Sequence, residues 1–453
     1  MLNDFWVSRA AKEGVDQPVR KIQSIKNSEL GESSSCAPSS TVVARRPTVI
    51  LVLNGGSSSI KFAVYRAGSG HVRLLWGELT HIGERDAKLT IQMHASFINA
   101  CNATYSATSR TIRGAKSRES ARLLLAAIAA RLCGYTVVAV GHRVVHGGIY
   151  LAGHQKITAR VLTLLKRSIP IDPAHLPLEI ALIEAARSQF SRAFQYACLD
   201  SAFHEHLPRD AQLLPIPRRY TRDGLRRFGF HGLSYGYLMQ ELLRCGGTAA
   251  VGGRVLLAHL GAGSSMAAVK AGRPLDTTMA FTPTAGLVMA TRPGDLDPGL
   301  LVYLMRAYPH LKTAAAMDLF INTECGMFGI SESTGDMQTL LSIASRDIRA
   351  ADAINQYVYA ARKNLGSMVA VMGGLDTLVF SGGIGEHATA IRARICAGLE
   401  FLGVKIDQRA NRLRKAIIST SSSKVTVRVI PTDEERFMID IITDALSVGR
   451  NSA

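Results

Sequence analysis

Hydrophobic runs that end abruptly in polar or glycine-rich segments recur along this chain. The first covers residues 49–53 and ends at Asn54, and the chain becomes apolar again over residues 60–65. Residues of high strand propensity on both sides of a Gly/Ser turn predict a β-hairpin. The turn contains two glycines and the hydroxyl donors Ser57, Ser58 and Ser59, so its backbone can approach a ligand closely.

A second copy of this pattern lies further along the chain, at residues 255–272 (VLLAHLGAGSSMAAVKAG). Placing Gly56-Ser57-Ser58 on Gly263-Ser264-Ser265 aligns strand, turn and strand in both copies. Two separated hairpins of this kind favour two similar sheet domains that face one another across a cleft. The alternative is a chance similarity between two ordinary hairpins.

The rest of the pattern alternates between the two periodicities. Further strands are predicted at residues 136–140, 194–199, 376–380 and 425–430. Helices are predicted at residues 117–132, after a proline-containing loop within 171–187, from about 234, at 299–319, at 346–372, after the strand at 376–380, and from about 433. Strands that alternate with helices indicate an α/β architecture with mixed sheets.

Length and charge narrow the class of protein. A chain of 453 residues is too long for one compact core, so two domains are expected. The net charge of +18 favours anionic ligands, but the basic residues are scattered as singles and pairs, which argues against nucleic-acid binding. The longest apolar run, residues 123–130, is much shorter than the roughly 20 residues of a membrane span.

Cysteine usage and the N-terminal segment indicate a cytoplasmic protein. The seven cysteines are irregularly spaced without a CxxC pair, as expected of free thiols in a reducing compartment. No secretory signal is apparent at the N-terminus. Residues 1–46 combine charges with a serine-rich patch and show no periodicity, so we expect a disordered extension there.

Several short motifs bear on phosphate chemistry. The first hairpin lacks the Gly-Lys-Ser/Thr ending of a P-loop, and GIGEHA at 383–388 lies too near the C-terminus for a Rossmann fold. His142 and His146 leave a strand, where a spacing of four gives no shared helical face, so a zinc pair is not expected. Arg143 between them can hold a carboxylate or phosphate, although a surface ion pair is an equal alternative.

The motifs together resemble the acetokinase family, the acetate kinases, over about residues 48–445. The matching segments are Asn54 with GSSSIKF, GHRVVHGG, DSAFH from Asp200, FGFHG, HLGAGSS, FTPTAGLVMATRPGDLDPG, FSGGIGE and PTDEE, in that order. The resemblance implies two duplicated ribonuclease H-like (actin-like ATPase) domains around a nucleotide cleft. It places the N-terminal domain at 47–200 plus 433–453 and the nucleotide-binding domain at 201–432.

The resemblance also implies a reaction and the residues that carry it. ATP would phosphorylate a short carboxylate with Mg²⁺ (or Mn²⁺), in a homodimer that needs neither nucleic acid nor membrane. The catalytic residues would be Asp200, His231 and Arg292. The substrate-binding residues would be Arg143, Val145, Ala174, Phe230 and Pro283, and those near the metal would be Asn54 and Glu434. The ATP-contacting residues would be Lys61, His259, Leu260, Gly261, Ala262, Gly263, Asp336, Met337, Gln338, Gly383, Ile384, Gly385, Glu386 and His387.

Four departures from the family pattern leave alternatives open. Ala262 replaces Asn, Gln338 replaces Arg, and His387 replaces Asn, which motivates a nucleotide-binding protein with a decayed active site. Residues 171–177 read IDPAHLP in place of LAPLHNP, so Ala174 removes about three carbons of bulk and favours propionate or butyrate. A sugar kinase is a third alternative, although an apolar pocket beside an arginine suits a small carboxylate better.

Overall fold

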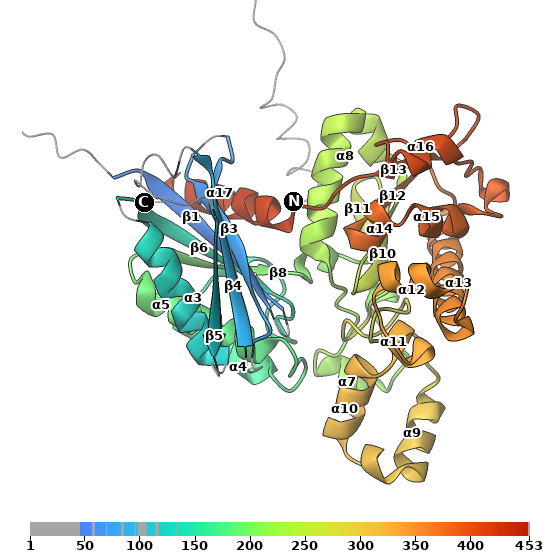
Figure 1. Cartoon of the computed structure of the whole chain (residues 1–453), viewed down its shortest axis with the longest axis horizontal. Helices are drawn as coiled ribbons and strands as arrows, with labels where there is room; N and C mark the ends of the chain where they lie inside the picture. Colours follow the sequence, from blue (N-terminus) through green and yellow to red (C-terminus); the bar gives the residue numbers. More distant parts are fainter. Residues whose placement is uncertain are drawn as a thin grey trace, which may run out of the picture.

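The computed structural model describes residues 46–451 except 57–58, 69, 83–85, 96, 98–106, 114–116 and 133. Ser57, Ser58 and residues 1–45 of the predicted extension lie outside the described residues. The described chain forms two lobes, each built on one mixed β-sheet (Figure 1).

The strands fall into two sheets. Sheet A contains β1 (Thr48–Gly55), β2 (Ile60–Arg66), β3 (Arg73–Thr80), β4 (Asp86–Met93), β5 (Ala107–Arg113), β6 (Thr136–Val144), β7 (Gln155–Lys156) and β8 (Phe194–Leu199). Sheet B contains β9 (Arg254–Leu260), β10 (Ser264–Lys270), β11 (Arg273–Thr277), β12 (Thr377–Ser381) and β13 (Thr426–Val429).

The helices connect and cover these strands. They are α3 (Ser117–Arg131), α4 (Ala159–Ser168), α5 (Leu176–Gln189), α6 (Arg209–Gln212), α7 (Arg218–Arg222), α8 (Gly232–Gly252), α9 (Pro298–Ala307), α10 (Ala314–Thr323), α11 (Gly326–Ser331), α12 (Met337–Ile343), α13 (Ile348–Met372), α14 (Gly382–His387), α15 (Thr389–Cys396), α16 (Gln408–Arg412) and α17 (Glu434–Asn451). Short 3₁₀ helices lie at Ala202–His204, Pro309–Leu311 and Glu400–Leu402.

The two sheets repeat one topology. Sheet A has the order β5-β4-β3-β2-β1-β6-β8-β7, and sheet B has the order β11-β10-β9-β12-β13. In both, the hairpin strands are antiparallel and the first of them is parallel to a later strand, β6 for β1 and β12 for β9. The unit β3-β2-β1-β6-β8 therefore matches β11-β10-β9-β12-β13 strand for strand, and the internal duplication is real.

Apolar layers cover both faces of each sheet, which explains why the central strands are almost continuously apolar. In β1, Val49 and Leu51 pack with α3 and α5, whereas Ile50 and Val52 pack with α8 and α17. In sheet B, Leu256 and its face-mates pack with α13, and the opposite face also contacts α8. Helices α8 and α17 thus lie in an apolar layer shared by the two sheets (Figure 1).

Local differences from the predicted elements have physical causes. Strand β6 continues to Val144, so Arg143 lies within the strand and not in a loop. The predicted helix at 299–319 is divided into α9 and α10, because Pro309 cannot continue an α-helix. Strands β4, β5, β7 and β11 were not predicted. Among the described residues, every helix is too short or too polar to cross a membrane.

Candidate active site

The carboxyl ends of three neighbouring strands in sheet A bring polar side chains together. Strands β1, β6 and β8 are adjacent and parallel, so their ends meet at one edge of the sheet. Asn54 is next to the end of β1, Arg143 is next to the end of β6, and Asp200 directly follows β8. The sequence placed these three residues far apart, and the topology makes them neighbours.

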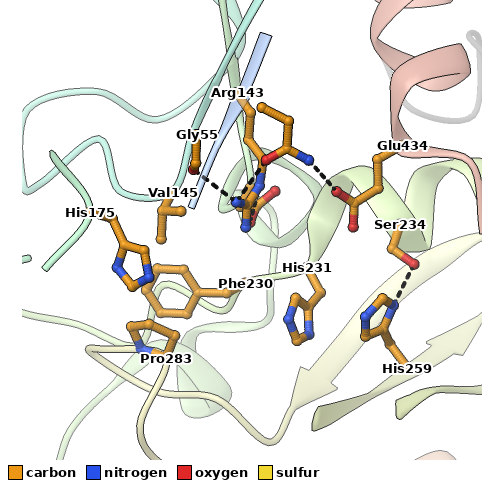
Figure 2. A network of polar contacts seen from close by, with 12 residues as sticks. Gly55, Arg143, Val145, His175, Phe230, His231, Ser234, His259, Pro283 and Glu434 are labelled. Atoms are coloured by element: carbon orange, nitrogen blue, oxygen red, sulfur yellow. Dashed lines mark hydrogen bonds and ion pairs between the residues drawn. The ribbon is translucent and has the colours of Figure 1, made fainter. Parts of the chain in front are cut away.

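Arg143 and Asp200 form a buried ion pair at this edge. Oδ2 of Asp200 accepts from Nη2 of Arg143 at 2.6 Å and from Nε at 3.2 Å. Nη1 of Arg143 donates to Oδ1 of Asn54 at 3.1 Å and to the carbonyl of Gly55 at 3.4 Å (Figure 2). The side chain of Asp200 is 1% exposed and that of Arg143 is 15% exposed. The guanidinium is therefore held in one orientation, with part of its surface still accessible.

Burial sets the charge state of this pair. Burial raises the pKa of Asp200 above its ordinary value, and Arg143 opposes that rise. Burial alone would lower the pKa of Arg143, but Asp200 and Glu434 more than offset it, so the guanidinium remains charged. Because Glu434 acts on both groups, its carboxylate belongs to the same site.

The oxygen atoms in this corner suit a hard divalent cation. Oδ1 of Asp200 is buried and has no hydrogen-bond partner among the residues that the structure describes. Oε2 of Glu434 accepts from Nδ2 of Asn54 at 3.2 Å, which brings the Glu434 carboxylate into the same corner as Asp200 (Figure 2). Within the described part of the chain, no cluster of three or more His, Cys, Asp or Glu residues would enclose a metal. The corner therefore fits a cation such as Mg²⁺, which keeps most of its ligands as water and phosphate oxygens.

His231 faces this corner from the start of α8. Its backbone is in the left-handed region (φ 59°), which is uncommon for a residue other than glycine. The N–H of Gly232 donates to the carbonyl of Asp200 at 2.9 Å, and a Cβ at Gly232 would lie 2.1 Å from that oxygen. Glycine is therefore required there for α8 to begin against the end of β8, and this close approach positions His231.

The imidazole of His231 is fixed and neutral. Its Nδ1 shares a hydrogen bond with Oγ of Ser265 at 2.8 Å, and its ring lies 4.3 Å from the ring of His259. Burial lowers the pKa of His231 well below its ordinary value, and the nearby His259, Arg143 and Arg292 lower it further. His259 is anchored in turn by Ser234, whose Oγ lies 2.8 Å from Nδ1 (Figure 2). No role was predicted for Ser234, and Ser265 was noted only as part of the second Gly/Ser turn.

Arg292 lies on the loop that follows β11. Nη1 of Arg292 donates to the carbonyl of Pro283 at 3.2 Å. Burial lowers the pKa of Arg292, while Asp172 raises it and Arg143 lowers it. These interactions place Arg292 near both Arg143 and the segment that precedes α5. The site therefore combines two cationic side chains from different lobes.

A small apolar group lies beside these cations. Val145, Phe230 and Met289 are buried together, and Phe281 packs against them. The ring of His175 lies close to Val145, Phe230 and Pro283 in Figure 2. Ala174 is exposed on the preceding turn and is not part of the buried group. Of the predicted pocket residues, Val145, Phe230 and Pro283 thus come together, and His175 joins them.

Glu179 is a buried acid that the sequence analysis missed. Its two carboxylate oxygens accept from the backbone N–H of Val145 at 3.1 and 3.2 Å. Burial raises its pKa well above the ordinary value, and Arg143 only partly offsets this. An acid within an otherwise apolar helix face carries no sequence signal that identifies its partner on another element.

The predicted ATP-contacting segments meet at the corresponding edge of sheet B. Residues 259–263 span the end of β9 and the turn after it, residues 383–387 lie in α14 directly after β12, and these two strands are parallel neighbours. The backbone of Ala290 bonds to Ala262 at 3.0 Å, and Gly335 packs closely under Ala290, which brings the segment at 336–338 alongside.

The side chains of these segments differ in exposure. Gly383 has open space around its Cα, and Ala262, Gln338 and His387 are exposed. Met337 is buried in the core, as are Leu260 and Ile384, so only their backbones can face a ligand. Lys61 is exposed on β2 opposite Asn54. All of these nucleotide assignments remain predictions.

Comparisons with known proteins agree with this arrangement. A model of the acetokinase family matches residues 49–440. Acetate kinase from Rhodopseudomonas palustris (strain TIE-1) is 41% identical over 393 residues, which cover 85% of this chain and 96% of that protein. Propionate kinase PduW from Salmonella typhimurium is 35% identical over 395 residues, 85% of this chain and 94% of that protein.

Solved structures resemble the whole arrangement of both lobes. The crystal structure of Porphyromonas gingivalis acetate kinase matches with a TM-score of 0.76 and 32% identity, covering 88% of this chain and 99% of that one. A propionate kinase from Francisella tularensis matches with a TM-score of 0.77 and 31% identity, covering 86% and 98%. The predicted resemblance and fold class, duplicated actin-like ATPase domains, are confirmed. The chain belongs to the acetokinase family, whose members are phosphotransferases that act on a carboxyl group.

Proposed function

We propose that this protein is an acetate kinase, which transfers the γ-phosphoryl group of ATP to acetate and releases ADP and acetyl phosphate. The observation that carries this proposal is the buried Arg143–Asp200 pair, which faces His231 and Arg292 beside a small apolar group. The cations suit two anionic reactants, and the apolar group suits a methyl. We propose that this reaction is reversible.

The proposed transfer needs orientation and charge stabilisation more than proton transfer. The acetate is already an anion, so one of its oxygens can attack the γ-phosphorus while the bond to the bridging oxygen of ADP breaks. Arg143, fixed by Asp200 and Asn54, holds the carboxylate with its accessible N–H groups. Most of the catalytic effect would therefore come from holding the two anionic reactants together.

Charge that develops on the equatorial oxygens would be stabilised by two side chains. Arg292 supplies a cation, and neutral His231 supplies a hydrogen-bond donor that Ser265 and the ring of His259 keep in place. Asp200, Asn54 and Glu434 would hold Mg²⁺ (or Mn²⁺), which neutralises phosphate charge when bound. No strong general base is required among the residues of this chain.

The test is acyl-phosphate formation, trapped as hydroxamate, with ATP, Mg²⁺ and acetate, propionate or butyrate. We expect turnover of acetate, and we expect Arg292→Ala to lower kcat by about 10²–10³, as for other removed transition-state donors. The acid with the highest kcat/KM is the preferred substrate. Turnover that survives unchanged in Arg292→Ala would contradict the proposed site.

Two alternatives have specific support. Ala174 stands where the family pattern has leucine, and relatives named propionate kinase are similar to this chain at 35% and 31% identity, so propionate or butyrate is the first. A nucleotide-binding protein with a decayed site is the second, supported by Ala262 without a side-chain amide. ATP binding without turnover of any acid would favour it. A sugar kinase would instead release ADP when a polyol replaces the acid, without forming a hydroxamate.

Assembly and location complete the proposal. We propose a homodimer, and the apolar side chains exposed on α9, Val302 (45%) and Tyr303 (60%), are consistent with a covered surface. A mass measurement in solution tests this. We also propose that the enzyme works in the cytoplasm, which agrees with the free thiols of Cys198, Cys245 and Cys325.

A further inference from the structure

Asp172 and His175 form a polar pair at the apolar group of the candidate site. Oδ1 of Asp172 lies 2.8 Å from Nδ1 of His175 and also accepts from the backbone N–H of His175 at 3.3 Å. The side chains are 5% and 12% exposed, respectively. Asp172 stands where the family pattern has alanine, so the carboxylate that holds this ring is a departure of this chain.

The pair fixes both the orientation and the tautomer of His175. Burial pushes the pKa of Asp172 up, but its contacts with His175 and its proximity to His146 bring it below the ordinary value, so the carboxylate is ionised. An ionised carboxylate only accepts hydrogen bonds, so Nδ1 of His175 carries the proton. Nε2 then points away from Asp172 and has no partner among the described residues.

Nε2 faces the apolar group that would receive the acyl chain. Figure 2 shows the ring of His175 directed at Phe230 and Pro283, next to Val145. The wall behind it is rigid, because Nε2 of His146 donates to the carbonyl of Phe281 at 3.0 Å and its ring packs edge-on against Phe230. The acyl end of the site therefore presents one polar atom on a firm apolar surface.

A hydroxyl group is the substituent that suits this atom. If His175 is neutral, Nε2 accepts a hydrogen bond, and if it is protonated, Nε2–H donates one; a hydroxyl can do both. A methyl group can do neither and would leave the nitrogen desolvated and unpaired.

We propose that the Asp172–His175 pair makes this site selective for short 2-hydroxy acids, so that glycolate is phosphorylated in preference to propionate. This inference rests on the proposed carboxylate kinase function. Glycolate and propionate have the same number of heavy atoms and differ only by hydroxyl for methyl. Comparing them therefore separates hydrogen bonding from the volume of the acyl group.

The experiment measures kcat/KM for acetate, glycolate and propionate in the full chain with ATP and Mg²⁺. We expect glycolate to exceed propionate by about tenfold or more in the wild type, and Asp172→Ala to bring the ratio near one. Asp172→Asn keeps an acceptor for Nδ1–H and should keep most of the preference. Asp407→Ala, which removes a distant acidic helix cap on α16, is the matched control and should leave the ratio unchanged.

Each outcome decides the inference. A wild-type ratio at or below one overturns it, as does an Asp172→Ala protein that keeps the wild-type ratio. A variant that loses kcat/KM for all three acids in proportion reveals a merely structural role and also overturns it. If no acid is phosphorylated by the wild type, acetate included, the proposed function itself has failed, which is distinguishable from turnover without selectivity.

Discussion

Removing one partner of the Arg143–Asp200 pair should strongly lower the free energy of unfolding, because the other partner is left buried without its counter-charge. In Asp200→Asn, the guanidinium of Arg143 stays largely buried and exchanges its carboxylate partner for a neutral amide, beside Asn54 and the Gly55 carbonyl. Breaking a buried ion pair from one side typically costs about 3–5 kcal/mol. Because the side chain of Arg143 is 15% exposed, we expect the free energy of unfolding to fall by about 3 kcal/mol, the lower end of that range.

A double-mutant cycle isolates the interaction. Arg143→Met alone leaves Asp200 buried without its cation, whereas the double variant leaves two neutral groups. We therefore expect the two single losses to exceed the double loss by about 2 kcal/mol, in the range found for residues in contact. Urea unfolding followed by circular dichroism gives the three free energies of unfolding.

A matched control uses an exposed pair of the same kind. Arg349 and Glu332 lie 3.1 Å apart, with side chains that are 53% and 69% exposed. Glu332→Gln should leave the unfolding curve within experimental error, because solvent screens exposed pairs. If the losses in the Arg143–Asp200 cycle add to within about 0.5 kcal/mol, the pair is not coupled and the argument for a fixed guanidinium is wrong.

Three further predictions concern neighbouring features. Glu179 has a folded pKa above its unfolded value of 4.5, so the stability that its protonated form contributes at low pH is lost as the pH rises toward the folded pKa. Glu179→Gln should remove this slope, at most about 1.4 kcal/mol per pH unit, and parallel Tm profiles for variant and wild type would contradict it. Gly232→Ala should destabilise by about 1–3 kcal/mol, because its Cβ would meet the carbonyl of Asp200, whereas Gly366→Ala, at an exposed position of α13, should stabilise by about 0.5–1 kcal/mol. Equal Tm shifts for the two would refute this. Ala262→Asn should lower the KM for ATP about threefold to tenfold, the equivalent of one hydrogen bond, and an unchanged KM would place that side chain away from the nucleotide.

Much of the fold could be predicted because its central strands carry strong local signals. Residues 49–53 and 255–260 are apolar on both faces, and strand 194–199 was predicted with the bounds of β8. Strand β4 alternates buried with exposed residues, and β5 at the sheet edge has the mostly polar sequence ATSRTIR, so neither carries a continuous apolar signal. The predicted domain boundaries remain untested.

The site could be predicted only where motifs carried it. Arg143, Asp200 and His231 lie together as the resemblance implied, but their contacts depend on the parallel order of β1, β6 and β8. The bond from Glu179 to Val145 joins a helix to a strand end, so no local pattern shows it. The unusual segment at 171–177 was noted, yet its Asp–His hydrogen bond depends on a turn geometry that spacing alone does not determine.

The covalent path between the lobes limits how they can move. The chain leaves sheet A after Asp200 and returns from sheet B after β13, and the two passages touch where Oγ of Ser234 meets Oγ1 of Thr432 at 2.9 Å. The apolar layer of α8 and α17 also spans both lobes at this crossing, so the connection has a buried core. We expect any opening of the lobes to turn about this connection, which would move Arg292 relative to Arg143 while the contacts within each lobe stay intact.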